Sequence, residues 1–133
     1  MSPPRQVLII ESDPNAVAQM RRVLAGMQMR AIAVSDEDEL RDVLSSLISK
    51  HAPPVLIVAR VALPSGSGIR MLEETAAQFP EAQQMLISHH PRNLLFSVPG
   101  FAEHCVNFLK AEFTDEQFRV AVERSLARGS AAP

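Results

Sequence analysis

Charged and hydroxyl-bearing residues directly follow several short apolar runs of this sequence, and they are its strongest candidates for chemistry. Glu11-Ser12-Asp13 follows one run, while Arg60, Ser88 and Lys110 end or follow three others. A guanidinium, an ammonium and a hydroxyl that lie together could bind a phosphate-containing or carboxylate ligand. Alternatively, Arg60 could pair with Glu11, and also with Asp13, because an unpaired charge at a buried strand end is costly.

The elements that must position these residues alternate between apolar runs and stretches of helical spacing. Apolar runs predict strands at residues 7–10, 31–34, 55–58, 85–87 and 106–109. Apolar spacing and capping residues predict helices that begin near residues 14, 36, 69 and 114. Within residues 89–104 the helical pattern fails, and Pro99-Gly100 cuts it short. We therefore expect the fourth helix to be short or irregular.

This alternation predicts an α/β fold with a five-stranded, doubly wound parallel sheet and helices on both faces. In such folds functional residues lie outside the carboxyl ends of the strands. The predicted strand ends are Glu11-Ser12-Asp13, Ser35-Asp36, Arg60, Ser88 and Lys110.

Length and composition limit the function classes. A chain of 133 residues suits one domain, which we place at residues 1–128, with a linker or disordered tail at 129–133. The formal net charge of −2 gives no electrostatic case for binding nucleic acid or an anionic membrane. The single cysteine, Cys105, and the lack of a long apolar run lead us to expect a cytoplasmic protein.

The strand-end residues resemble those of the response-regulator receiver domains of two-component signalling, the CheY-like family, over roughly residues 7–128. The stretch VLIIESDP matches the acidic end of the family's first strand, and VARVALPSGSG matches the third strand with the Pro64 and Gly68 that follow it. Ser88 matches the Thr or Ser of the fourth strand, and Lys110 in NFLKAEF matches the lysine of the fifth. The resemblance implies a flavodoxin-like sheet of strand order 2-1-3-4-5.

The resemblance also shows where this chain departs from the family. Receivers are phosphorylated on an aspartate, and Arg60 stands at the position equivalent to that phosphoacceptor. A guanidinium is not a phosphoryl acceptor here and repels Mg²⁺, which receivers hold with an acidic pair. The equivalent pocket, Glu11, Ser12 and Asp13, is degenerate, because Ser12 replaces the second acid. We therefore expect Mg²⁺ binding to be lost and no cofactor to be used.

The positions equivalent to the receiver switch are also altered. The switch-like positions are Ser88, Asn107 and Lys110, and Asn107 stands where the family has an aromatic residue. Phe108 is expected to face the other way. Ala111 replaces the proline that usually follows the lysine. We interpret the chain as an atypical pseudo-receiver.

Three functions follow from this interpretation. The first is a phosphorylation-independent interaction module that docks a protein partner or an attached output domain, or forms a homodimer through the face of helix 4, strand 5 and helix 5. The second is a small-anion sensor that uses Arg60, Lys110 and Ser88. The third and least favoured is a phosphorylated receiver with another acceptor, such as Glu11 or Ser88. No residue is expected to be catalytic, so we do not expect an enzyme.

The histidines and the cysteine predict no metal site. His89-His90 and His104-Cys105 lack the spacing of metal ligands, so we expect the histidines to lie in solvent-exposed loops. Cys105 is expected to open the fifth strand as a small core residue.

Overall fold

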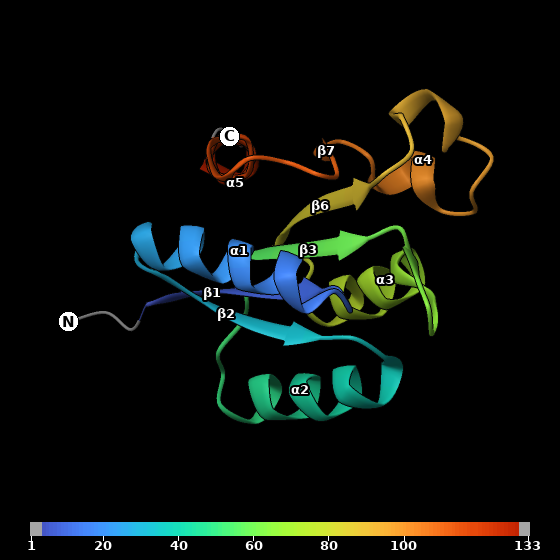
Figure 1. The fold of residues 1–133 in the computed structure, drawn as a ribbon. Helices are drawn as coiled ribbons and strands as arrows, with labels where there is room; N and C mark the ends of the chain where they lie inside the picture. The colour runs from blue at the N-terminus through green and yellow to red at the C-terminus, as the bar shows by residue number, and fades with distance from the viewer. Residues whose placement is uncertain (1–3, 131–133) are drawn as a thin grey trace.

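The central sheet forms from the predicted apolar runs (Figure 1). The computed structural model describes residues 4–130. The strands are β1 (Arg5–Ile10), β2 (Met29–Val34), β3 (Leu56–Arg60), β6 (Gln83–Ser88) and β7 (Phe108–Lys110). All are parallel, in the order β2-β1-β3-β6-β7. This is the predicted flavodoxin-like order, so the predicted fold class is confirmed.

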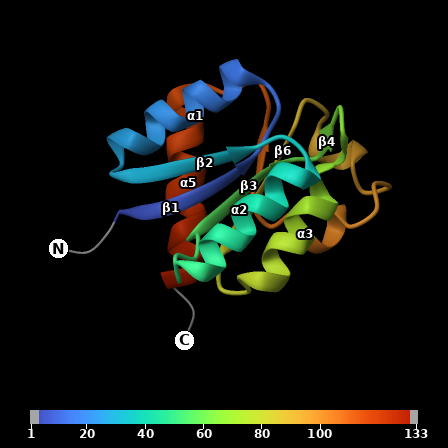
Figure 2. The same ribbon diagram turned by 90° about the horizontal axis from the view of Figure 1, so that it is seen from below.

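Helices cover both faces of the sheet. They are α1 (Pro14–Gly26), α2 (Glu37–Ser49), α3 (Gly68–Gln78), α4 (Phe101–His104) and α5 (Asp115–Ser130). Figure 2 shows α1 and α5 on one face and α2 and α3 on the other. Alternate residues of each central strand pack into two separate apolar clusters: Leu8 and Ile57 lie in the α2/α3 cluster, and Val7 and Val58 in the α1/α5 cluster. Burial on both faces explains why these strands are continuous apolar runs without polar alternation.

Capping side chains place the helix starts next to the strand ends. Asp13 accepts a hydrogen bond from the amide of Asn15 at 2.9 Å, directly before Pro14. Asp36 caps α2 in the same way, and the hydroxyl of Ser67 accepts from the amide of Arg70 at 3.2 Å. These bonds satisfy amides that have no partner inside a helix. They also fix where the chain turns back at the carboxyl edge of the sheet.

The region between β3 and α3 contains a feature that the sequence did not predict. Strands β4 (Ala62–Leu63) and β5 (Gly66–Ser67) pair antiparallel as a short hairpin. Each strand has two residues, too few for any periodicity to be visible.

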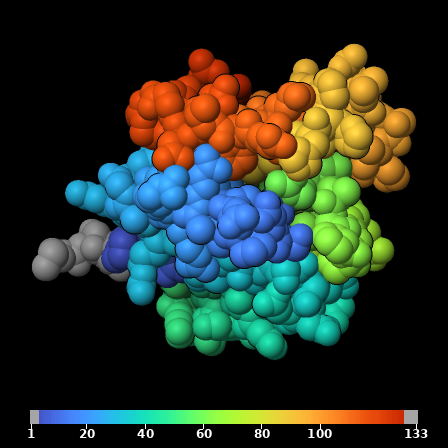
Figure 3. Space-filling model, in the orientation of Figure 1, coloured from blue at the N-terminus to red at the C-terminus, as the bar shows by residue number. Residues whose placement is uncertain are grey.

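The segment between β6 and β7 is largely irregular, as predicted. A single 3₁₀ turn, η1 (Arg92–Leu94), precedes α4, which has only four residues. Gly100 enters α4 with φ of +83°, a left-handed conformation that glycine adopts at little cost. In the space-filling view this segment, residues 89–107, forms a lobe that projects above the hairpin (Figure 3).

Two predicted positions need correction. The fifth strand begins at Phe108, because Cys105 directly follows α4 and Val106 is exposed; Cys105 is nevertheless buried, as expected of a core residue. His104 is not in an exposed loop: it ends α4, and its side chain is 16% exposed. Helix α5 ends at Ser130, and residues 131–133 of the predicted tail lie outside the described part, so the predicted domain boundary at 128 stays a prediction.

Candidate functional site at the carboxyl edge of the sheet

The strand order brings the predicted site residues to one edge of the sheet. β1 lies beside β3, and β3 lies beside β6 with Arg60 in register with Ile87. Glu11 directly follows β1, and Ser88 and Lys110 are register partners at the ends of β6 and β7. The order of neighbours along this edge is therefore Glu11, Arg60, Ser88 and Lys110.

Arg60 and Glu11 form a buried, bidentate ion pair. The Nε of Arg60 donates to Oε1 and Oε2 of Glu11 at 2.6 and 2.8 Å, and its Nη2 lies 2.5 Å from Oε1. The side chains are only 14% and 2% exposed, respectively. A planar guanidinium matches a carboxylate in this way, and a lysine could not reproduce the geometry. The pairing predicted from the sequence is thus present.

The backbone after β1 completes the environment of Glu11. The amide of Ser12 donates to Oε2 of Glu11 at 2.8 Å, and the amide of Asp13 approaches the same oxygen at 3.4 Å. The carboxylate of Asp13 caps α1 and is exposed. No hydrogen bond or ion pair joins Asp13 to Arg60 in residues 4–130, so the additional pairing that we considered is not formed.

Gly68 allows the start of α3 to pack against the end of β3, where Arg60 lies. A Cβ atom at residue 68 would lie 1.7 Å from the carbonyl oxygen of Arg60 and 2.9 Å from its carbonyl carbon. The amide of Gly68 donates to the carbonyl of Val61 at 3.1 Å, which draws the start of α3 against the end of β3. Only glycine permits this close approach of two backbone segments.

The acidic pocket does not fit a Mg²⁺ ion. Both oxygens of Glu11 are engaged by Arg60, and Ser12 contributes no carboxylate. Mg²⁺ needs oxygen ligands around it and would meet a fixed positive charge in this pocket. Among residues 4–130 there is also no group of three or more His, Cys, Asp or Glu side chains that could hold a metal ion.

Arg60, Ser88 and Lys110, the residues of the predicted anion cluster, have different surroundings. Arg60 is occupied by Glu11, while Ser88 is buried, with its Oγ accepting the amide of His90 at 3.1 Å. Ser88 lines a cavity beside α3, whereas Lys110 is exposed and lines a groove beside α5. The backbones of Ser88 and Lys110 are neighbours in the sheet, but the two residues line different cavities.

Asn107, which the sequence predicts to be a switch-like position, is held by two hydrogen bonds. Its Nδ2 donates to the carbonyl of Gln84 at 2.8 Å, and its Oδ1 accepts from Nε of Arg128 at 2.7 Å. Phe108 packs in the α2/α3 cluster, with its ring centroid 5.9 Å from that of Phe101. Arg128 comes from α5, and no motif or spacing in the sequence indicates its contact with Asn107.

The histidines divide into two kinds. His89 and His90 are exposed, as predicted. The ring nitrogens of His104 lie 2.7 Å from Oε1 of Gln84 and 3.2 Å from Oε2 of Glu73. His104 therefore ties α4 to β6 and α3.

Comparison with solved structures identifies the fold. The signal receiver domain of an HD domain-containing protein from Pseudomonas fluorescens Pf-5 superposes with a TM-score of 0.76 at 16% identity, over 98% of this chain and 93% of that one. The chemotaxis response regulator CheY4 of Vibrio cholerae gives 0.74 at 15% identity, over 92% and 99%. This chain has the receiver fold. No protein-family model matches the sequence, and no curated protein matches it.

A receiver fold can be one part of a longer protein. NtrX from Brucella abortus matches with a TM-score of 0.76 at 17% identity, over 96% of this chain but only 28% of NtrX. Among residues 4–130, no helix is both long and apolar enough to span a membrane.

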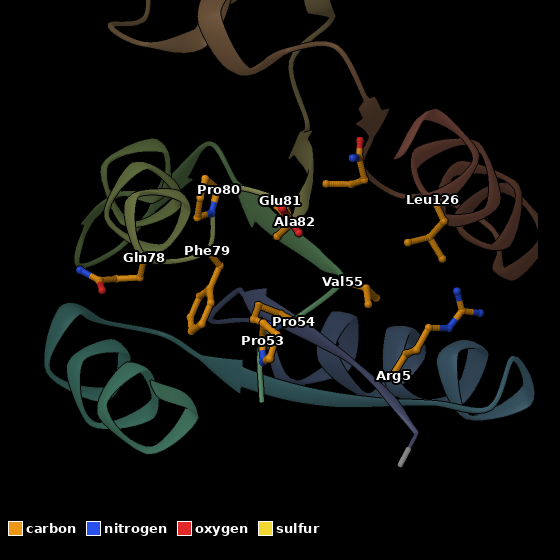
Figure 4. A pocket seen from close by; sticks show the side chains of 11 residues that line it. Arg5, Pro53, Pro54, Val55, Gln78, Phe79, Pro80, Glu81, Ala82 and Leu126 are labelled. Atoms are coloured by element: carbon orange, nitrogen blue, oxygen red, sulfur yellow. The ribbon is translucent and has the colours of Figure 1, made fainter. Parts of the chain in front are cut away.

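A separate cavity lies at the opposite, amino edge of the sheet (Figure 4). It has a volume of about 560 Å³, and its lining includes Arg5, Val55, Phe79 and Leu126. It is therefore distant from the strand-end residues of the receiver fold and belongs to no part of the site described above.

Proposed function

We propose that this receiver-fold domain is a pseudo-receiver that transmits signals by binding protein, without phosphorylation of its own. The observation that carries the proposal is the Arg60–Glu11 ion pair. At the position equivalent to the phosphoacceptor, a permanent cation neutralises the remaining acid. It thereby supplies the positive charge that Mg²⁺ provides in an active receiver.

The altered switch position supports the same proposal. In a phosphorylated receiver a ring at this position changes orientation on activation. Here a polar side chain, Asn107, is fixed from both sides by Gln84 and Arg128. Lys110 makes no ion pair with any residue in the described part of the chain, so it is not engaged at the pocket. We therefore propose one resting conformation and no catalytic step by the chain's own residues.

The proposed interaction surface is the face formed by α4, β7 and α5. β7 is an edge strand, and the groove between it and α5 is lined in part by the apolar residues Phe108, Leu109 and Val120. The groove also contains Lys110 and Arg124, which have no acidic partner within residues 4–130. Such a groove suits an output domain, a separate protein with acidic groups at its rim, or a second copy of this chain.

A titration with Mg²⁺ and beryllofluoride, a phosphoryl mimic, tests the loss of the phosphorylation switch. Backbone NMR shifts are recorded for the wild type and for Arg60→Asp. We expect no site-localised shifts in the wild type, because Arg60 excludes the metal. Shifts that cluster at Ser88 and Lys110 in the wild type would overturn the proposal.

Sedimentation equilibrium tests the homodimer form of the interaction. If the β7/α5 groove joins two copies, Val120→Glu should convert the dimer to a monomer. Ile48→Glu is the matched control, because Ile48 is an exposed apolar residue on α2, away from the groove. A monomer at every concentration would rule out the homodimer, and an equal effect of both variants would rule out this face.

A further inference from the structure

We propose that the cavity between α3 and the lobe of residues 89–107 binds a small organic anion, such as a phosphomonoester or a carboxylate with an apolar body. The cavity has a volume of about 910 Å³, within the range of small-molecule sites in proteins. Its lining residues come from the end of β6, the β4–β5 hairpin, α3 and the lobe of residues 89–107. The proposal does not depend on the proposed function, because none of its residues is part of the Arg60–Glu11 pair.

The cavity lies beside the segment that leads into the short helix α4. Pro99 and Gly100, which directly precede α4, line it and divert the chain into an irregular path. The diverted backbone is packed tightly against α3: a Cβ at residue 100 would lie 2.8 Å from Cγ2 of Ile69. The outer wall is thereby held in place rather than left to close over the cavity.

One end of the cavity has the chemistry of an anion site. Arg70 makes no ion pair with any other residue in the range 4–130, and it lines the cavity together with His90. Ser88 also lines the cavity and is only 6% exposed; its oxygen accepts the amide of His90, and its hydroxyl hydrogen has no acceptor among the described residues. That hydrogen is free to be donated to a ligand oxygen in the cavity.

The start of α3 adds to this end of the cavity. Ser67, the cap of α3, lines it, and α3 has 11 residues, so its amino end carries a useful positive potential. The helix dipole alone would not define a site. Together with a free guanidinium and the buried hydroxyl of Ser88, it favours a single anionic group at this end.

Two acidic residues and the apolar walls restrict the ligand further. Glu73, one helical turn after Arg70, and Glu103 also line the cavity. Glu73 is in addition 3.2 Å from the ring of His104. These carboxylates would repel a second anionic group, so a compound with two phosphates is disfavoured. Leu95 and Val98 form an apolar wall, which an aromatic or aliphatic body would cover.

The test is NMR titration of the intact chain with phenyl phosphate, inorganic phosphate and a benzene bisphosphate. We expect phenyl phosphate to bind most tightly, with shifts at Ser67, Arg70, Ser88 and His90. Arg70→Gln should weaken phenyl phosphate by at least about tenfold, since a charge-assisted hydrogen bond is lost. Arg41→Gln is the matched control, because Arg41 is an exposed arginine on α2.

Several outcomes would overturn the proposal. Shifts that map to the Lys110 groove would place the anion elsewhere, and equal weakening by Arg70→Gln and Arg41→Gln would indicate non-specific attraction. Inorganic phosphate binding as tightly as phenyl phosphate would mean that the apolar wall contributes nothing. Failure of this proposal would leave the beryllofluoride test intact, because that test looks for shifts at both Ser88 and Lys110, and Lys110 does not line this cavity.

Discussion

Substitution of Arg60 by methionine should strongly destabilise the chain, because it leaves a buried carboxylate without its cation. The side chain of Glu11 is 2% exposed, and it would lose the two Nε contacts and the Nη2 contact from Arg60. Breaking a buried ion pair from one side usually costs about 3–5 kcal/mol. The amides of Ser12 and Asp13 would still donate to Glu11, so we expect the lower end, about 3 kcal/mol.

The partner variant, Glu11→Gln, should cost less. Its amide oxygen can still accept from Arg60 and from the amide of Ser12, and the guanidinium of Arg60 is 14% exposed and can reach water. We expect a loss of about 2 kcal/mol. In the double variant neither charge is present, so the two losses should not add, with a coupling free energy of about 2 kcal/mol.

The assay is urea unfolding of the wild type, both single variants and the double variant, with the free energy of unfolding compared at constant m-value. Arg22→Met serves as a control, because Arg22 pairs with Asp115 on the surface and both side chains are more than half exposed. Arg22→Met should lower the free energy of unfolding much less than Arg60→Met does. A loss below about 0.5 kcal/mol for Arg60→Met, or full additivity in the cycle, would refute the claim that this pair is a buried, coupled unit.

Two further predictions concern backbone fit and pH. Gly68→Ala should lower the melting temperature and shift the NMR signals of Arg60, because the new Cβ would lie 1.7 Å from the carbonyl oxygen of Arg60. Gly26→Ala is the control: no atom lies within 4 Å of its new Cβ, so it should not lower the melting temperature. A hydrogen bond from Arg22 holds the pKa of Asp115 below its ordinary value, with a smaller contribution from a glutamine. Because the pKa of Asp115 is lower in the folded state, its ion pair contributes stability at pH values above the unfolded-state pKa. This stability is lost as the pH falls through the folded-state pKa. Asp115→Asn should therefore make the free energy of unfolding less dependent on pH between about pH 5 and pH 2. An unchanged pH dependence, or equal effects of the two glycine variants, would contradict these expectations.

The sheet and the ion pair were predictable from the sequence because both depend on strand order. Continuous apolar runs define β1, β3 and β6, and parallel strands place their carboxyl ends at one edge. Opposite charges that directly follow β1 and end β3 must then lie close together, as Glu11 and Arg60 do. For these two residues, side-chain position follows from topology alone.

Positions set by loop geometry were not predictable in the same way. Lys110 ends β7 in register with Ser88, yet the two side chains line different cavities. His104 could be read as a loop residue until the four-residue α4 placed it against Gln84 and Glu73. In both cases the outcome depends on local backbone direction and on a partner far away in sequence, neither of which leaves a periodic signal.

The apolar core that maintains the receiver fold is separate from the Arg60–Glu11 pocket, so the proposed loss of phosphorylation chemistry need not disturb the scaffold. The two apolar clusters that hold the helices to the sheet include neither Glu11 nor Arg60. The charges of these two residues cancel, so the pocket needs no metal to balance it. Because the pocket is closed by a bond within the chain, signalling through the β7/α5 face would have to be set by a partner or a ligand. The cavity beside α3 shares no residue with the pocket, and Ser88 links it to the strand next to β7. It offers a physical route by which a small anion could influence that face.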